Sequence, residues 1–76
     1  MTITEEQFRF MVEDISADLI ERLVSREHRS LKEAVDILYS SDTYKALTRP
    51  ETGLYVQSSG YIFEYLTSEL KTGKLS

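Results

Sequence analysis

Apolar residues near the start of the chain are spaced as they are on one face of a helix. Over residues 5–26 they recur at intervals of three, four and seven positions, which is the repeat of an amphipathic α-helix. This stripe consists of Phe8, Met11, Val12, Ile15, Leu19 and Leu23. Thr4 and Gln7 have the spacing of a capping box, in which both side chains satisfy free N–H groups of the first turn. The pattern therefore predicts one long helix that begins directly after Thr4.

The same helix carries a second group of apolar residues, well away from the stripe. This group consists of Phe10, Ala17, Ile20 and Val24. A helix that packs on one side only would leave them in water, and exposed apolar surface that gathers in one place marks an interaction site. We therefore expect another protein, or a second copy of this chain, to cover that side.

Two more helices are predicted in the remainder of the chain. Ser30 and Glu33 repeat the capping-box spacing and mark the start of the first one. Its apolar positions are Leu31, Ala34, Val35, Leu38 and Tyr39. The last helix is expected over residues 60–71, with Ser58 or Ser59 as its cap. Its apolar side consists of Ile62, Phe63, Tyr65, Leu66 and Leu70.

The region between these two helices is broken at several points. Residues 43–47 could add one short helix, with Ser41 or Asp42 as its cap. Pro50 and Gly53 then predict a turn, because proline fixes φ and glycine allows a positive φ.

An extended connector is predicted after this turn, at residues 54–57, where polarity alternates. It would lay apolar side chains on the helices, either Leu54 and Val56 or Tyr55. No second strand of similar quality is visible, so we predict an all-α fold, a small bundle of three main helices with a short fourth one. Residues 1–76 form one domain, with Gly73 as the last helical stop and with residues 1–4 and 72–76 frayed.

Composition limits what kind of protein this is. With 76 residues, 41% of them hydrophobic, the chain supports one small core. It has no Cys, which excludes disulfides and thiolate metal sites. No apolar run approaches the roughly 20 residues needed to cross a membrane, and residues 1–6 lack the apolar segment of a secretory signal. We expect a cytoplasmic protein.

Residues able to carry out catalysis are scarce. His28 is the only imidazole and falls in a short charged linker, where a solvated side chain is expected rather than a general base. The sequence has no Gly-rich phosphate loop, calcium loop or nucleophile elbow. We therefore expect that the protein is not an enzyme and that it binds no metal and no cofactor. The alternative is a small ligand-binding protein or enzyme with Tyr55, Tyr61 and His28 around a pocket.

Charge is distributed unevenly along a chain whose formal net charge is −4. Residues 1–21 hold six acids and one Arg, a net charge of −5, whereas residues 22–32 hold four bases and one Glu, a net charge of +3. We call the four bases the basic corner: Arg22, Arg26, Arg29 and Lys32. They could contact DNA in a transcriptional regulator, but Glu33 and Asp36 lie in the predicted recognition helix, and DNA-binding domains usually have a pI above about 9. Nucleic acid is therefore the alternative partner, and an acidic protein face is preferred.

Aromatic residues are concentrated toward the C-terminus, where six of the eight fall in the second half of the chain. Tyrosine is enriched at interface cores, although it also fills the rim of small hydrophobic cores. Together with the second apolar group, these residues define the candidate partner-binding set: Phe10, Ile20, Val24, Tyr55 and Tyr61.

The segments LYSSDTYKAL (38–47) and PETGLYVQSSGYIFEYL (50–66) resemble small bacterial proteins of a domain-of-unknown-function group associated with toxin-antitoxin-like gene neighbourhoods. The resemblance implies a bacterial interaction module, such as the small partner or antitoxin-like component of a two-gene operon. It supplies no catalytic motif and no binding residues, so no residue role is carried over.

Overall fold

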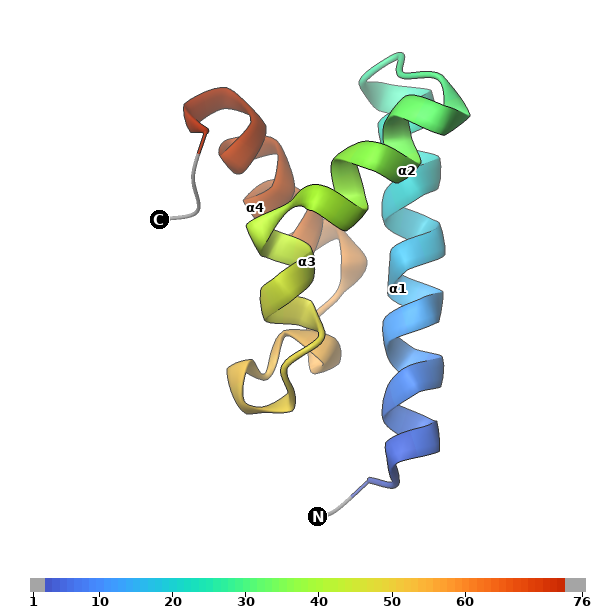
Figure 1. Ribbon diagram of the computed structural model, residues 1–76, viewed down its shortest axis with the longest axis vertical. Helices are drawn as coiled ribbons and strands as arrows, with labels where there is room; N and C mark the ends of the chain where they lie inside the picture. The colour runs from blue at the N-terminus through green and yellow to red at the C-terminus, as the bar shows by residue number, and fades with distance from the viewer. Residues whose placement is uncertain (1–2, 74–76) are drawn as a thin grey trace.

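Helices make up most of residues 3–73, the part of the chain that the computed structural model describes (Figure 1). They are α1 (Glu5–Arg26), α2 (Leu31–Ser40), α3 (Asp42–Leu47), the 3₁₀ helices η1 (Pro50–Thr52) and η2 (Leu54–Val56), and α4 (Ser59–Thr72). No strand occurs within that part, which confirms the all-α bundle of three main helices and a short fourth one. Two residues that were expected to fray are ordered parts of helices: Thr4 caps α1, and Thr72 is the last residue of α4. Residues 1–2 and 74–76, which were also expected to fray, lie outside the described residues.

Both predicted capping boxes are formed. At the start of α1, Thr4 Oγ1 accepts a hydrogen bond from the Gln7 N–H at 3.0 Å, and Gln7 Oε1 accepts one from the Thr4 N–H at 2.9 Å. At the start of α2, Ser30 Oγ accepts from the Glu33 N–H at 3.1 Å, and Glu33 Oε1 accepts from the Ser30 N–H at 2.9 Å. These side chains satisfy N–H groups that the first turn leaves free, so both helices begin where the sequence predicts.

Serine caps fix the starts of α3 and α4. Ser41 Oγ accepts a hydrogen bond from the Tyr44 N–H at 3.0 Å, and Ser58 Oγ accepts one from the Tyr61 N–H at 3.1 Å. Of the alternative caps, the structure therefore uses Ser41 and Ser58. Gly73 ends α4 with a φ of 80°, a left-handed conformation that favours glycine.

The connector before α4 is helical, so the prediction of an extended segment is wrong. Leu54–Val56 forms η2, which follows Gly53 at φ 72° and ψ 5°. The left-handed glycine turns the chain back on itself, and the Gln57 N–H then donates to the Leu54 carbonyl at 2.9 Å. Over so few residues, alternating polarity cannot distinguish an extended segment from one 3₁₀ turn.

The core lies where α1 meets the other helices. The largest fully buried apolar side chains are Leu19, Leu23, Leu38, Leu47, Ile62 and Leu66. The predicted stripe of α1 is confirmed for its central residues, whereas Phe8 is only partly buried and Met11 is 36% exposed. The predicted apolar sides of α2 and α4 also have exposed members, which are Leu31, Tyr39, Tyr65 and Leu70. Leu31 and Leu70 lie in the terminal turns of their helices, where fewer neighbours can cover them.

α1 stands along one edge of the molecule (Figure 1). α2 crosses its C-terminal half, and α3 and α4 lie together on one side of it. α1 therefore packs against α2, α4 and η2 on its core side. The opposite side of α1 has no other element over it in the described part of the chain.

A carboxylate on α4 ties that helix to the start of α3. Glu69 accepts hydrogen bonds from the Asp42 N–H at 2.7 Å, the Thr43 N–H at 3.0 Å and the Thr43 hydroxyl at 2.8 Å. Burial raises the pKa of Glu69, but these hydrogen bonds and the nearby charge of Lys45 lower it by more, so the pKa lies below its ordinary value. The residues joined are 26 and 27 positions apart, so no local sequence pattern indicates this contact.

Candidate protein-interaction surface

The side of α1 that faces away from the core carries a line of apolar residues. Phe10, Ala17 and Val24 follow one another at intervals of seven positions, close to two helical turns. All three are exposed, with Phe10 at 65% and Val24 at 38%. We call this line, with the charged residues beside it, the outer face of α1.

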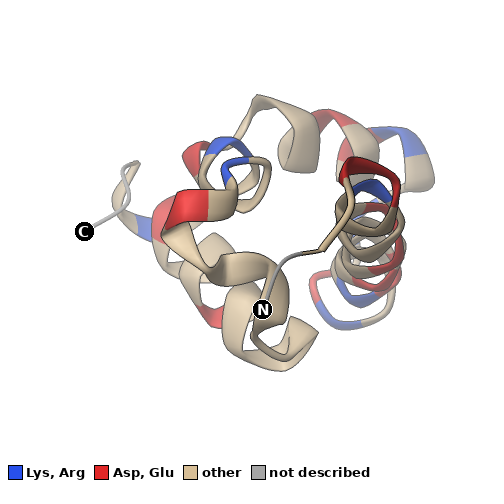
Figure 2. Ribbon diagram, turned by 90° about the horizontal axis from the view of Figure 1, so that it is seen from below, with Lys and Arg blue, Asp and Glu red and all other residues tan. Residues whose placement is uncertain are grey.

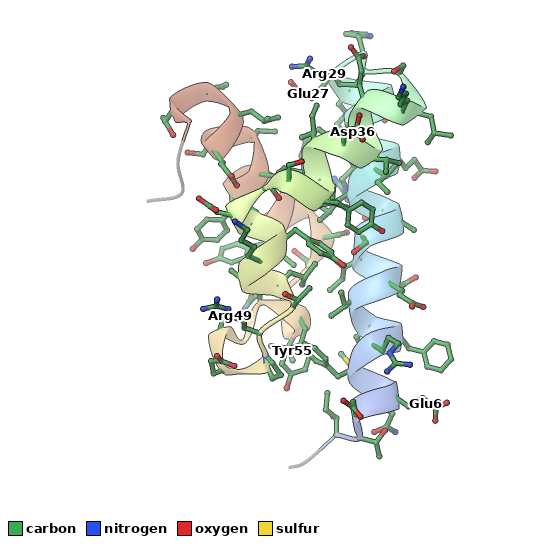
Figure 3. The ribbon with its side chains drawn as sticks, in the orientation of Figure 1. Glu6, Glu27, Arg29, Asp36, Arg49 and Tyr55 are labelled. Carbon is green, nitrogen blue, oxygen red and sulfur yellow. The ribbon has the colours of Figure 1, made fainter. Side chains whose placement is uncertain are left out.

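Acidic residues lie on both sides of this apolar line. Glu6 and Glu13, seven positions apart, lie on one side of it, and Asp14 and Glu21, with the same spacing, lie on the other. All four are exposed. Figure 3 shows Glu6 on the side of α1 turned away from α3, and acidic segments recur along the α1 ribbon in Figure 2.

None of these four acids forms a salt bridge within the described residues. The salt bridges found there join Asp18 to Arg22 and Asp42 to Lys45, and neither pair belongs to the outer face. Arg9 is an exposed base three positions after Glu6 and four before Glu13. The outer face therefore combines an apolar centre with a net negative border.

Ile20 was expected to be exposed to solvent together with Phe10 and Val24, but it is not. It is partly buried and packs against the hydrophobic core. α1 and α2 are in contact, and α2 crosses the C-terminal half of α1 (Figure 1). Ile20 therefore sits at the border between core and outer face.

The two tyrosines of the candidate set do not join this surface. Tyr55 is partly buried and packs edge-on against Phe8, with ring centroids 4.9 Å apart. Tyr61 is 45% exposed on α4 and pairs edge-on with Tyr65 at 5.2 Å, with their hydroxyl oxygens 3.1 Å apart. The five candidates thus divide among α1, η2 and α4 instead of forming one site.

The basic corner is not one continuous basic patch. Arg22 Nε donates to an Asp18 carboxylate oxygen at 3.1 Å, and its guanidinium lies 6.0 Å from the centroid of the Phe63 ring. This places Arg22 between α1 and α4, away from the α1–α2 linker. Arg29 lies at the same end of the molecule as Glu27 and Asp36 (Figure 3). Acidic neighbours therefore interrupt the remaining bases, and the linker is a mixed-charge surface.

Asp18 links α1 to the beginning of α4. Its carboxylate accepts hydrogen bonds from the Ser59 hydroxyl and from Arg22. The Ser59 hydrogen bond, followed by that of Arg22, lowers the pKa of Asp18 below its ordinary value. A carboxylate held ionised in this way is a weak proton acceptor, so the arrangement acts as a tie between two helices. Asp18 and Arg22 have the spacing of a helical ion pair, but no sequence signal indicates Ser59.

A shallow groove runs between α1 and η2. It has a volume of about 540 Å³ and is lined by Met11, Asp14, Ile15, Asp18, Tyr55, Val56, Gln57 and Ser59. The lining includes Tyr55 but neither Tyr61 nor His28. His28 is exposed in the α1–α2 linker with a φ of 56°. The three residues proposed for a ligand pocket therefore do not converge.

The fold and this surface describe a small all-α protein with one apolar, acid-bordered helix face. Comparisons of the chain with protein-family models, curated proteins and solved structures found no match. No helix in residues 3–73 is long and apolar enough to cross a bilayer. In the same residues, no three His, Asp or Glu side chains are grouped so that they could hold a metal ion.

Proposed function

We propose that this chain is a non-enzymatic interaction module that binds another protein through the outer face of α1. The observation that carries the proposal is Phe10, which is 65% exposed in a well-formed helix. Phenylalanine is among the residue types most often buried, and here it lines up with Ala17 and Val24. An apolar centre with a charged rim is the usual composition of a protein interface.

The resemblance of residues 38–66 to bacterial proteins suggests where the partner is encoded. In that reading the chain is the small, antitoxin-like component of a two-gene operon, and its partner is the product of the neighbouring gene. The reading agrees with the scarcity of catalytic groups, because Asp18 is engaged by Ser59 and Arg22 and His28 faces solvent.

A DNA-binding role has weaker support. One of its four bases, Arg22, is occupied by Asp18 and Phe63, and acids are interspersed among the others. Phosphate contacts supply most of the affinity of DNA-binding proteins, so a mixed-charge linker is a poor basis for that function.

Photo-cross-linking in the native host tests the proposal. A photoreactive phenylalanine analogue replaces Phe10, and in a matched control it replaces Val56, which is 62% exposed on η2. We expect a discrete cross-linked species from position 10 and none from position 56. Adding Val24→Ser to the position 10 protein should lower the yield, because it removes part of the same apolar line. Equal labelling from both positions, or no product from position 10, would contradict the proposal.

A further inference from the structure

We propose that the partner of the outer face of α1 is a basic, amphipathic helix of another protein, and not a second copy of this chain. The inference rests on the proposed function, because it names the chemistry of the partner that the surface binds. Three properties of the outer face support it: the sign of its charges, the spacing of its apolar residues and its length.

Charge decides between the two kinds of partner. Glu6, Glu13, Asp14 and Glu21 border the apolar line, and Arg9 is the base among them. A helix with Lys or Arg beside its own apolar stripe would place positive charges against both acidic rows. Opposite charges across an interface increase the association rate and select the partner.

Pairing with a second copy brings like charges together. In an antiparallel pair with Phe10 of each copy opposite Val24 of the other, Ala17 lies on the two-fold axis. Glu21 of each copy then lies opposite Asp14 of the other, because both are on the same side of the apolar line and lie four and three positions from Ala17. In a parallel pair, Glu13 of each copy lies opposite Asp14 of the other. Both arrangements oppose dimer formation.

The same negative border opposes two other classes of ligand. Nucleic acid and anionic lipid surfaces both present phosphate, which Glu6, Glu13, Asp14 and Glu21 repel. A basic polypeptide is therefore the macromolecule whose charge fits this face.

The apolar line further specifies the shape of the partner. Its residues repeat every seven positions, which is the repeat of two helices packed side by side. Ala17, at the centre, is small and allows a bulky side chain of the partner to approach between Phe10 and Val24. From Glu6 to Val24 the helix rises about 27 Å at roughly 1.5 Å per residue. A partner helix of about 18 residues would cover this length.

The test begins with the cross-linked product from position 10, by mass spectrometry of the partner peptide joined to it. We expect a segment with net positive charge and with apolar residues at intervals of three and four. A cross-link to an acidic or non-helical segment of another protein would overturn the inference while leaving the proposed function intact, whereas a cross-link to this chain itself would overturn both. Absence of any cross-link would overturn the proposed function as well.

The second step measures the charge contribution with a synthetic peptide that covers the cross-linked segment. Glu13→Lys with Glu21→Lys should weaken its binding about tenfold, because two exposed opposite-charge contacts become repulsive. The matched control, Glu51→Lys on η1, changes an exposed acid away from the outer face and should leave the affinity unchanged. Binding of the unaltered protein should also weaken with added salt. Equal affinity for both proteins, or affinity independent of salt, would refute a basic partner.

Discussion

Replacing Glu69 with alanine removes the carboxylate that ties α4 to the start of α3. Three donors lose their acceptor: the Asp42 N–H, the Thr43 N–H and the Thr43 hydroxyl. Thr43 is fully buried, whereas Asp42 is exposed. Water can therefore replace the carboxylate at Asp42 but reaches the two Thr43 groups poorly.

The expected loss of stability follows from these two Thr43 groups. A buried donor left without an acceptor costs about 1 to 3 kcal/mol. Allowing for some relaxation of α3 toward water, we expect Glu69→Ala to lower the free energy of unfolding by about 2 to 4 kcal/mol. In a domain of this size, such a loss is a large part of the total stability.

Urea unfolding followed by far-ultraviolet circular dichroism measures this loss. Glu64→Ala is the matched control, because it shortens an exposed glutamate on the same helix and should change stability by no more than about 0.5 kcal/mol. The reasoning is refuted if the two variants unfold at the same urea concentration.

The pH dependence provides a second check on Glu69. Its pKa in the folded protein lies below the ordinary value of 4.5, so ionised Glu69 favours the folded state. This contribution is fully present above pH 4.5 and is lost as the pH falls through the lower, folded-state pKa. The stability difference between the unaltered protein and Glu69→Ala should therefore shrink in acid. A difference that stays constant to low pH would show that the charge of Glu69 is irrelevant.

Three further substitutions test the fold by the same urea assay. Leu19→Ala, at a fully buried position, should cost about 2 to 5 kcal/mol; a loss under about 1 kcal/mol would contradict its place in the core. Ile20→Glu should cost about 1 to 3 kcal/mol, because Ile20 packs against the core, and unchanged stability would restore its assignment to the outer face. Gly53→Ala should cost about 1 to 2 kcal/mol through its φ of 72° alone, since no atom lies within 4 Å of the added Cβ; a neutral result would mean that the turn adopts another conformation.

The helices were predictable because their ends are encoded by neighbouring residues. Thr4 with Gln7 and Ser30 with Glu33 are capping boxes three positions apart, so local spacing is enough to find them. The connector was not predictable in this way. Its conformation depends on Gly53 adopting a positive φ. Alternation of apolar and polar residues does not indicate the φ angle of a glycine.

The candidate surface was predictable only in part, because packing between helices decides which apolar residues remain exposed. Phe10 and Val24 stay exposed as expected, but Ile20 is partly buried against the hydrophobic core. Arg22 belongs to the basic corner by sequence, yet it points toward Asp18 and α4. The Asp18 contact with Ser59 spans 41 positions, a separation at which sequence spacing carries no information.

Binding through the outer face of α1 requires that this helix be ordered before the partner arrives. Contacts on the core side keep α1 ordered, because Leu19 and Leu23 are buried there and the Asp18 carboxylate accepts a hydrogen bond from Ser59 of α4. Burying a fully exposed phenylalanine or valine contributes about 1.5 to 3 kcal/mol. Because the helix is already formed, little of this gain at Phe10 and Val24 is offset by ordering the chain. Phe10 stands largely in water, with 65% of it exposed, so its substitution should weaken binding and leave the free energy of unfolding almost unchanged.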